Sequence, residues 1–380
     1  ILTAADVTGA EAIHPGLGFL AENARFAEIV EGHGLTFIGP TPAQIAMLGD
    51  KIQAKQAALK AKLPLVPGGT ELIGSVASAQ RAALAAGFPV LIKAAAGGGG
   101  RGMQRVERKE DLARAFEVAT SEATAAFGDG SVYVEKAIDR PRHIEVQVLG
   151  DGKGHAVHLG ERDCTVQRRF QKLIEEAPSP VLSPEQRDHV GRLAAGLAAS
   201  IDYRGAGTVE FLYAGGEFYF IEMNARLQVE HPVTELVSGV DIVEAQLKVA
   251  AGVGLDLRQD DIRANGHAIE VRVNAEDSIT FAPSPGTVKL FHPPGGPGVR
   301  VDSHMFQGAK VPPYYDSLIA KLIVHAADRT AALARMRRAL DEFVIEGVST
   351  NLNLQRRIIR SSDFVANTID VVWLERWLAA

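Results

Sequence analysis

One stretch decides the fold: Gly207-Thr-Val-Glu-Phe-Leu-Tyr213, continued beyond a pair of glycines to Glu222-Met-Asn-Ala-Arg-Leu-Gln-Val-Glu-His-Pro-Val-Thr-Glu235. Aromatic and β-branched residues on both sides of the glycines predict a β-hairpin. Strand alternation and an odd-numbered loop would place Glu210 opposite Glu222, with Phe220 and Asn224 on the face of Glu222. Facing carboxylates repel unless a cation separates them. The stretch therefore predicts a Mg²⁺ site with Glu210, Glu222 and Asn224 as oxygen ligands; two exposed glutamates are the alternative.

The residues after this hairpin are polar and closely spaced. Arg226, Gln228, Glu230 and His231 fall within six positions, just before Pro232. A planar guanidinium next to an amide and a carboxylate suits a small oxyanion that must be held and deprotonated. A solvated surface loop would carry similar residues, so this alternative stays open on the pattern alone.

The composition narrows the class of protein. A chain of 380 residues with 46% apolar and 23% charged residues predicts two or three globular domains. Its net charge of -6 argues against nucleic acid or an anionic membrane as partner. The single cysteine, Cys164, excludes an intrachain disulfide framework and fits a reducing compartment. No run reaches the roughly 20 apolar residues of a membrane span, and no signal peptide is visible.

The run from Glu222 to Glu235 resembles the active-site segment of biotin carboxylase, the ATP-grasp component of biotin-dependent carboxylases. His14-Pro-Gly-Leu-Gly-Phe-Leu-Ala-Glu-Asn23 and Pro312-Pro-Tyr-Tyr-Asp316 resemble two further segments of that family. The resemblance extends from His14 to about Asn353. It departs from the family at Leu17, Ala21, Ala96 and Phe170, where Tyr, Ser, Gly and often His are usual.

The resemblance implies a mixed α/β and α+β protein with the ATP-grasp fold. Residues 1–38 would be a remnant of the N-terminal α/β (pre-ATP-grasp) domain, because about sixty residues that normally precede this point are absent and the chain reads as a fragment. A connecting segment, 39–64, would contain one amphipathic helix over residues 43–62. Residues 65–137 would form a mobile lid domain, and residues 138–380 the C-terminal α+β domain.

The predicted lid carries the signals for a nucleotide. Lys93 ends an apolar strand, 88–93, and a buried lysine needs an anionic partner unless it reaches water. The glycine-rich residues 97–102 precede a second strand, 103–106. They do not fit a dinucleotide fingerprint, which requires a helix at that point. Such a loop can instead offer backbone N–H groups to phosphates.

The resemblance assigns the nucleotide site residue by residue. Phosphate binding falls to Lys51, Lys93 and the glycine loop, and the adenine and ribose lie along the hinge and the following strands. The full set is Lys51, Lys93, Gly98, Gly99, Gly100, Glu135, Lys136, Ile138, His143, Gln167 and Leu212.

A cationic loop is predicted over residues 160–172. Arg162, Arg168, Arg169 and Lys172 fall within eleven positions of an acidic protein, which favours local anion binding over a merely solvated loop. The resemblance places Lys172 at the bicarbonate-binding position. It also places Arg272 at the position that stabilises the biotin enolate. Strand alternation puts Glu270, Arg272 and Asn274 on one face of the strand that carries it.

The implied reaction is MgATP + bicarbonate + biotin → ADP + phosphate + N-carboxybiotin, with Mn²⁺ as an alternative metal. Arg226, Gln228 and the Val229 backbone would hold bicarbonate, and Glu230 would act as its general base. Carboxyphosphate would form and break down, and Arg272 would stabilise the biotin enolate. The catalytic set would be Glu230, Arg272, Arg226 and Lys172.

The resemblance also implies partners and a place in the cell. Because no Ala/Val-Met-Lys-Met sequence is present, biotin would arrive on a biotin carboxyl carrier protein or a missing segment. A carboxyltransferase subunit or domain and a cytoplasmic homodimer are expected. Acetyl-CoA carboxylase of fatty acid biosynthesis is the expected system; the alternatives are propionyl-CoA, methylcrotonyl-CoA or pyruvate carboxylase. A different ATP-grasp carboxylate–amine ligase and an impaired nucleotide-binding fragment stay open.

Overall fold

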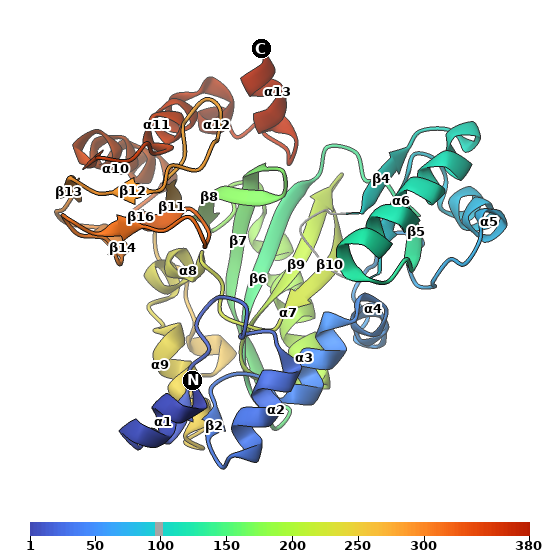
Figure 1. The fold of residues 1–380 in the computed structure, drawn as a ribbon, viewed down its shortest axis with the longest axis horizontal. Helices are drawn as coiled ribbons and strands as arrows, with labels where there is room; N and C mark the ends of the chain where they lie inside the picture. The colour runs from blue at the N-terminus through green and yellow to red at the C-terminus, as the bar shows by residue number, and fades with distance from the viewer. Residues whose placement is uncertain (96–101) are drawn as a thin grey trace.

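Residues 1–95 and 102–380 are described by the structure, a computed structural model whose elements gather around a central sheet (Figure 1). The N-terminal unit, at the bottom of that view, contains α1 (Leu2–Thr8), α2 (Ala24–Gly32) and a parallel pair of strands, β1 (Ala12–Ile13) and β2 (Thr36–Phe37). Val30 and Phe37 are fully buried in a cluster that includes Val146 and Val209 of the central sheet. The N-terminal unit is therefore packed onto the body of the protein.

The segment 43–62 forms two helices, so the prediction of a single helix is wrong. α3 spans Pro42–Gly49 and α4 spans Lys51–Lys60. Between them Asp50 has an extended backbone, and its carboxylate accepts hydrogen bonds from the N–H groups of Ile52 and Gln53. An aspartate N-cap satisfies the free donors at the start of a helix. Asp50 thus starts a new helix where the apolar pattern alone shows no interruption.

A small α+β unit with its own core lies to the right in Figure 1. An antiparallel sheet of β3 (Val90–Ala94), β4 (Met103–Val106) and β5 (Val132–Lys136) packs against α5 (Val76–Ala86) and α6 (Leu112–Phe127), which follows a 3₁₀ turn at Lys109–Asp111. The predicted strands are confirmed to within two residues. Gly98, Gly99 and Gly100 of the predicted nucleotide loop lie outside the described residues. The domain boundaries at residues 38, 64 and 137 stay predictions.

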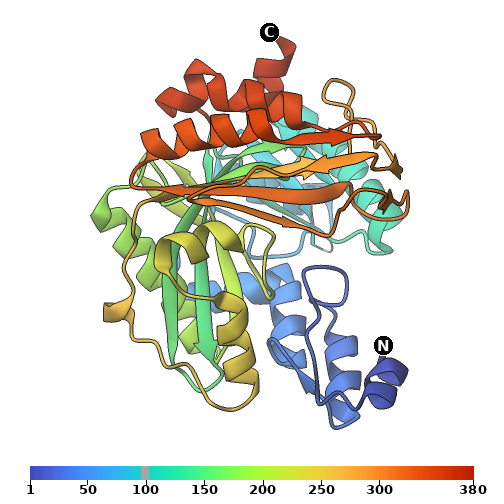
Figure 2. The ribbon, with the colours of Figure 1, turned by 90° about the vertical axis from the view of Figure 1, so that its left-hand side faces the viewer.

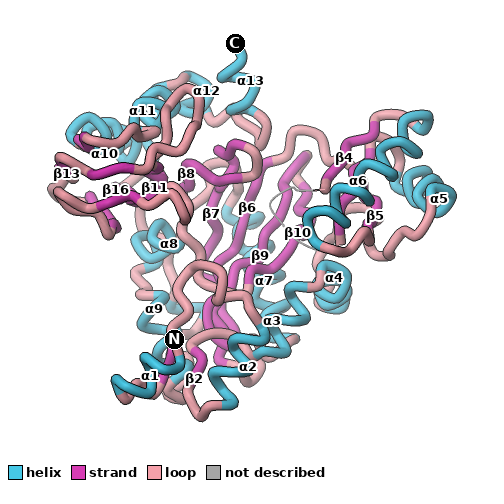
Figure 3. The backbone as a smooth tube through the Cα atoms, viewed as in Figure 1, coloured by secondary structure: helices cyan, strands magenta, loops and turns pink. Residues whose placement is uncertain are grey.

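In the described part of the chain the largest sheet has eight strands in the order β10-β9-β6-β7-β8-β11-β16-β14, and all neighbouring pairs are antiparallel. Figure 3 shows β6, β7, β9 and β10 in the middle of the molecule, with β11 and β16 at the upper left. Helix α7 packs against β6 and β7, α8 against β7, β8, β11 and β16, and α9 against β9. The bounds are β6 (Arg142–Asp151), β7 (Ala156–Arg168), β8 (Gln171–Ala177), β9 (Arg204–Ala214), β10 (Glu217–Asn224), β11 (His267–Asn274), β14 (Val299–Ser303), β16 (Leu318–Ala326), α7 (Pro184–Ser200), α8 (His231–Ser238) and α9 (Ile242–Ala250).

The C-terminal helices cover the β11–β16 end of this sheet, as Figure 2 shows from the side. Leu322, Met336 and Ile358 belong to the cluster that joins sheet and helices. The elements here are α10 (Arg329–Glu342), α11 (Leu352–Arg360), α12 (Ser362–Ala366), α13 (Trp373–Ala379) and the short antiparallel pairs β12 (Gly286–Thr287) with β15 (Lys310–Val311) and β13 (Leu290–His292) with β17 (Val344–Glu346), besides a 3₁₀ turn at Gln259–Asp261. Among the described helices none combines the length and apolar character needed to cross a membrane.

The hairpin of β9 and β10 brings Glu222 opposite Glu210 by a different route from the predicted one. Glu217 pairs with Ala214, so the loop holds two residues, and the predicted odd-numbered loop is wrong. In that register Glu222 would face away from Glu210. A β-bulge between Phe220 and Glu222 shifts the pairing by one residue and restores the Glu210–Glu222 pair.

The same bulge sends Phe220 to the other face. Phe220 pairs with Phe211, and both rings are fully buried in the core with centroids 6.3 Å apart. The prediction that Phe220 shares a face with Glu222 is therefore wrong. A bulge is invisible in strict alternation, because the extra residue reverses the side to which every later side chain points.

Residues 160–172 form most of a second hairpin, so the predicted cationic loop is also corrected. Strands β7 and β8 meet in a tight turn in which Arg169 and Phe170 have positive φ, 48° and 64°. Arg162 is fully buried, Lys172 lies in a cleft, and Arg168 is stacked 3.6 Å from the centroid of an aromatic ring. The four cations therefore do not form one cluster: Arg162 and Lys172 share Glu145, and Arg168 and Arg169 lie at or next to the turn.

Candidate active site

A cleft of about 1460 Å³ is lined by residues of the central sheet, α4 and the small α+β unit. It brings together most of the site residues that the sequence predicts. Those that line it are Lys51, Lys93, Glu135, Ile138, His143, Gln167, Lys172, Glu210, Leu212, Glu222, Asn224, Arg226, Gln228, Val229, Glu230 and Arg272. Lys136 does not, because its Nζ donates to the carbonyl oxygens of Gly87 and Phe88, each at 2.8 Å.

Lys172 joins two carboxylates of the central sheet and one at the start of α8. Its Nζ donates to Glu145 Oε2 at 2.5 Å, Glu230 Oε1 at 2.7 Å and Glu210 Oε1 at 2.9 Å. Burial opposes the charged form, but the three carboxylates outweigh it and raise the pKa of Lys172 well above its usual value. The lysine is therefore a permanent cation that fixes the spacing of three acids.

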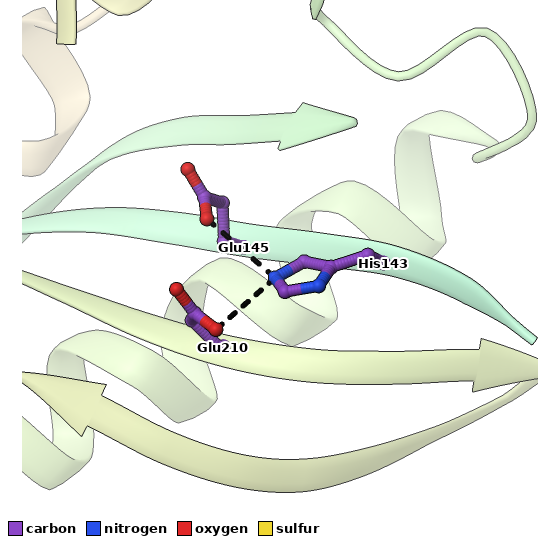
Figure 4. Close-up of side chains that lie close together, drawn as sticks. All are labelled: His143, Glu145 and Glu210. Atoms are coloured by element: carbon purple, nitrogen blue, oxygen red, sulfur yellow. Dashed lines mark ion pairs between the residues drawn. The ribbon is translucent and has the colours of Figure 1, made fainter. Parts of the chain in front are cut away.

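His143 lies between two of these acids (Figure 4). Its Nε2 is 3.2 Å from Glu210 Oε2 and 3.7 Å from Glu145 Oε2, as an ion pair without hydrogen-bond geometry. Burial disfavours protonation, yet Glu210 outweighs burial and raises the pKa of His143 to about 9. An imidazolium has no free lone pair, so in this protonation state the trio is an ion-pair network.

Arg162 holds the floor of the cleft from beneath. It is fully buried and donates to Glu145, Gln147, Thr208, Gln228 and Thr234 at 2.5–3.1 Å. Gln228 in turn donates to Glu210 at 2.9 Å. The guanidinium thus connects three strands and the polar segment after the hairpin.

Glu222 differs from the other acids of the cleft. It receives no hydrogen bond from the described residues, and both burial and the neighbouring Glu210 raise its pKa. Asn224, two residues further along the strand, presents its amide beside it and leaves Nδ2 without a partner. Two opposed carboxylates, one of them unpaired, are a donor set that fits a divalent cation of the Mg²⁺ type.

Arg226 is held by a residue of the N-terminal unit. Its Nε donates to Glu22 Oε2 at 2.7 Å, and the backbone N–H of Ala225 donates to Glu22 Oε1 at 2.9 Å. Its Nη2 donates to Asn224 Oδ1 at 3.0 Å. These contacts orient the guanidinium at the edge of the cleft.

Glu230 is shared between two cations. Oε1 accepts from Lys172, and Oε2 accepts from Arg272 Nη2 at 2.9 Å. Burial opposes ionisation of Glu230, but Lys172, Arg272 and Arg162 together outweigh it, and the pKa of Glu230 falls below its usual value. The group is therefore ionised at neutral pH. Lys321 Nζ donates to the Val229 carbonyl at 2.9 Å and fixes the backbone just before it.

Lys93 has the anionic partner that its apolar strand predicts. Glu135, 3% exposed, accepts from Lys93 through Oε1 and from Lys55 through Oε2 at 2.8 Å. Burial raises the pKa of Glu135, yet the two lysines outweigh it and lower the value to about 2. Lys55 also lies 4.0 Å from the centroid of the Tyr133 ring.

Lys55, Arg162, Glu145 and Glu22 belong to the site but were not predicted as site residues. Lys55 lies on a helix rich in Ala, Gln and Lys, where an exposed lysine is the usual case. Glu145 lies two residues after His143 on the same predicted strand, so both side chains point to one face. This spacing is the sequence signal that could have identified Glu145 as a site residue. Arg162 was expected only as part of a cationic loop, whereas its partners lie up to 72 residues away. Glu22 meets a partner 204 residues away, so no local pattern marks it.

The fold and the cleft define an ATP-grasp enzyme. Residues 50–258 match the family model described as "Carbamoyl-phosphate synthase L chain, ATP binding domain". Residues 1–45 match "Biotin carboxylase, N-terminal domain" and residues 270–376 match "Biotin carboxylase C-terminal domain". The chain belongs to the biotin carboxylase family, and it is a ligase.

Curated relatives and solved structures agree with this assignment. The biotin carboxylase of Pseudomonas aeruginosa is 53% identical over 382 residues, which cover 100% of this chain and 84% of the relative. A pyruvate carboxylase subunit from Methanothermobacter thermautotrophicus is 51% identical, covering 96% and 74%. The biotin carboxylase–beta-gamma-ATP complex from Campylobacter jejuni has a TM-score of 0.96 at 49% identity, covering 99% and 84%.

A further solved structure is the biotin carboxylase domain dimer of 2-oxoglutarate carboxylase from Hydrogenobacter thermophilus, in complex with MgADP, ADP and bicarbonate. Its TM-score is 0.94 at 50% identity, covering 99% of this chain and 83% of that one. The predicted ATP-grasp fold and biotin carboxylase family are thereby confirmed.

Proposed function

We propose that the chain carboxylates biotin on a biotin carboxyl carrier protein, using ATP and bicarbonate. The observation that carries the proposal is the arrangement of one cleft. Glu222, a carboxylate with no hydrogen-bond donor in the described part of the chain, faces Glu210 on the hairpin, while the ionised Glu230 is held between Lys172 and Arg272. The first pair suits metal-bound phosphates, and the second suits an oxyanion that must lose a proton.

The first step forms carboxyphosphate. Arg226, Gln228 and the Val229 N–H hold bicarbonate, and Glu230 takes its hydroxyl proton. The freed oxygen attacks the γ-phosphorus of ATP, the bond to the β-phosphate oxygen breaks, and ADP leaves. Because phosphoryl transfer depends on positioning and charge neutralisation, the lysines near the phosphates supply most of the help. Holding bicarbonate in line with the phosphate also favours it over free water as the nucleophile.

The second step moves the carboxyl group to biotin. Carboxyphosphate breaks into CO₂ and phosphate, and the phosphate takes the proton from N1′ of biotin. The biotin enolate that results attacks CO₂ and gives N-carboxybiotin. Arg272 stabilises the negative charge on the ureido oxygen, as a guanidinium fork does for an oxyanion.

We assign the nucleotide and the metal to the other half of the cleft. Lys51, Lys93 and the glycine loop contact phosphates, with the adenine and ribose next to Glu135, Lys136, Ile138, His143, Gln167 and Leu212. Glu210, Glu222 and Asn224 hold Mg²⁺ or Mn²⁺, which neutralises charge on the phosphates. The Campylobacter and Hydrogenobacter structures, named for complexes with a β,γ-ATP and with MgADP and bicarbonate, support this assignment.

The final acceptor and the partners are part of the proposal. We propose acetyl-CoA, in the first step of fatty acid biosynthesis, with a carrier protein, a carboxyltransferase and a cytoplasmic homodimer. Relatives named for pyruvate and 2-oxoglutarate carboxylases show that similar chains serve other acceptors. Reconstitution with each carboxyltransferase and its acyl-CoA or oxoacid substrate distinguishes them, and product from pyruvate alone would contradict acetyl-CoA.

Two variants test the mechanism. Glu230→Gln removes the base before carboxyphosphate forms, so both bicarbonate-dependent ATP hydrolysis and carboxylation of free biotin fall by about 10²–10⁴-fold. Arg272→Gln lowers carboxylation more than ATP hydrolysis, because carboxyphosphate still forms and decomposes in water. Since Arg272 also contacts Glu230, the separation is one of degree.

The control is Glu244→Gln, which removes an exposed glutamate paired with Lys248 on α9 and leaves both rates unchanged. Full carboxylation in Glu230→Gln would contradict the assignment of the base. An equal loss of both rates in Arg272→Gln would contradict its role toward biotin.

A further inference from the structure

Two fully buried glutamates lie next to Arg272 and have no role in the reaction proposed above. Glu175 on β8 and Glu270 on β11 are register partners in the antiparallel pair of these strands, and both are 0% exposed. Directly opposed residues of such a pair have Cβ atoms about 4.5–5.5 Å apart on the same face. The two carboxyl groups therefore face each other inside the protein.

Three of the four oxygens of this pair lack a donor among the described residues. Glu175 Oε1 accepts from Arg272 Nε at 2.6 Å, whereas Glu175 Oε2 and both oxygens of Glu270 have no hydrogen-bond partner. Two ionised carboxylates in this position would repel each other and leave buried lone pairs unsatisfied, which protein interiors avoid. A single proton removes the repulsion and joins two of the three oxygens, because a carboxylic acid donates its O–H to a neighbouring carboxylate.

The charged groups around Glu270 are engaged elsewhere. Arg272, on the same strand, is bound to Glu175 and Glu230. Lys321 on β16 donates to a backbone carbonyl and lies 3.4 Å from an aspartate. Burial raises the pKa of Glu270 well above its usual value. Burial also raises the pKa of Glu175, to about 7, against the attraction of Arg272. Lys321 and Arg272 attract Glu270 only from a distance, whereas Glu175 forms an ion pair with Arg272. Among the described residues no cation pairs with Glu270, so the proton belongs on Glu270.

We propose that Glu270 is a neutral carboxylic acid in the folded protein and donates a hydrogen bond to Glu175, which stays ionised and positions Arg272. Both glutamates act through Arg272 and touch no substrate, so they are positioning residues. With Nε held by Glu175, the guanidinium keeps its place when Nη2 exchanges Glu230 for substrate. The role given to Arg272 rests on the proposed function, whereas the shared proton does not.

Infrared absorption tests the shared proton directly. A protonated carboxyl group has a C=O stretching band that a carboxylate lacks, so wild-type protein at pH 7 shows such a band and Glu270→Gln loses it. The matched control is Glu176→Gln, which removes the adjacent buried acid of β8, ionised beside His267 and Arg329, and leaves the band in place. A band that survives Glu270→Gln, or that wild type lacks, overturns the proposal.

The coupling ratio, ATP hydrolysed per biotin carboxylated, tests the positioning role. Glu175→Gln weakens the charged contact to Arg272 and raises the ratio by about tenfold or more. Glu270→Ala raises it too, because Glu175 loses its donor, and Glu270→Gln restores it, because an amide N–H replaces the acid O–H. A ratio that rises at high pH in wild type, as Glu270 ionises, stays flat in Glu270→Gln.

A merely structural role would lower both rates in proportion and leave the ratio and its pH profile unchanged, which would overturn the positioning role. If no variant and no wild-type protein carboxylates biotin, the proposed function fails. The infrared result then still decides whether Glu270 carries the proton.

Discussion

The two walls of the cleft hold their charges in different ways. On the wall made by the central sheet and the segment after its hairpin, called the sheet wall, Glu145, Glu210 and Glu230 are each bound by Lys172. On the opposite wall, made by α4 and the small α+β unit, three lysines surround one carboxylate: Lys51, Lys55 and Lys93 lie around Glu135. On the sheet wall, several acids share the same cations. On the opposite wall, called the lysine wall, several lysines share one acid.

This difference separates what each wall can do for a ligand. The acids of the sheet wall are held in place by their cations, which suits a base and a metal ligand whose positions must not vary. The lysine wall has more cations than acids, and burial lowers the pKa of Lys51 and Lys55. A bound anion therefore stabilises the charged form of these lysines. We therefore expect the phosphates to bind against the lysine wall and bicarbonate against the sheet wall.

The largest expected effect comes from removing His143, the imidazolium that lies between Glu210 and Glu145. The pKa of His143 rises from 6.5 to about 9 on folding, so its contribution to stability is complete below pH 6.5 and is lost as pH rises through 9. His143→Gln should lower the free energy of unfolding by at most about 3 kcal/mol at pH 6, and by far less at pH 9.5. Urea unfolding at both pH values measures the difference.

The matched control is His189→Gln on the exposed side of α7, where the substitution should have little effect at either pH. A deficit for His143→Gln that is equal at pH 6 and pH 9.5 would show that the imidazole is not charged by the acids of the sheet wall.

The next effect sharpens the contrast between paired and unpaired acids. Glu222 lines the cleft and has no hydrogen-bond donor among the described residues, so Glu222→Gln should weaken Mg²⁺ binding about 100-fold while the Lys172 network stays intact. Titration of Mg²⁺ against ATP hydrolysis gives the half-saturating concentration. Glu217→Gln, on the exposed end of the same strand, is the control. Identical titration curves for both variants would make Glu222 a surface charge and nothing more.

The smallest effect concerns the lysine wall. Without Lys55, Glu135 depends on Lys93 alone, which leaves Lys93 less available for phosphate. Lys55→Met should raise KM for ATP about tenfold with little change in kcat. Lys60→Met, at the exposed end of the same helix, should leave KM unchanged. A loss in kcat without a change in KM would mean that Lys55 acts only on the fold.

Particular residues show how far the sequence reaches. The aromatic runs around Gly215-Gly216 predict the hairpin, and Lys93 in an apolar strand predicts a buried anion, which is Glu135. Asp50 and the bulge before Glu222 were missed, although both are local. Residue type alone does not distinguish an aspartate that caps a helix from a solvent-exposed aspartate. A bulge reverses the alternation of side chains without changing the composition of the strand.

The sequence by itself determined the elements, the family and most of the residues that line the cleft, because strand alternation, turn glycines and a long ungapped run are local properties. The tertiary structure decided the charge of those residues and their partners. Lys55 meets Glu135 across 80 residues, and Arg162 meets Gln228 across 66. A carboxyl group is a base, a metal ligand or a neutral acid according to its burial and the cations that folding brings within about 3 Å, and no stretch of sequence contains that information.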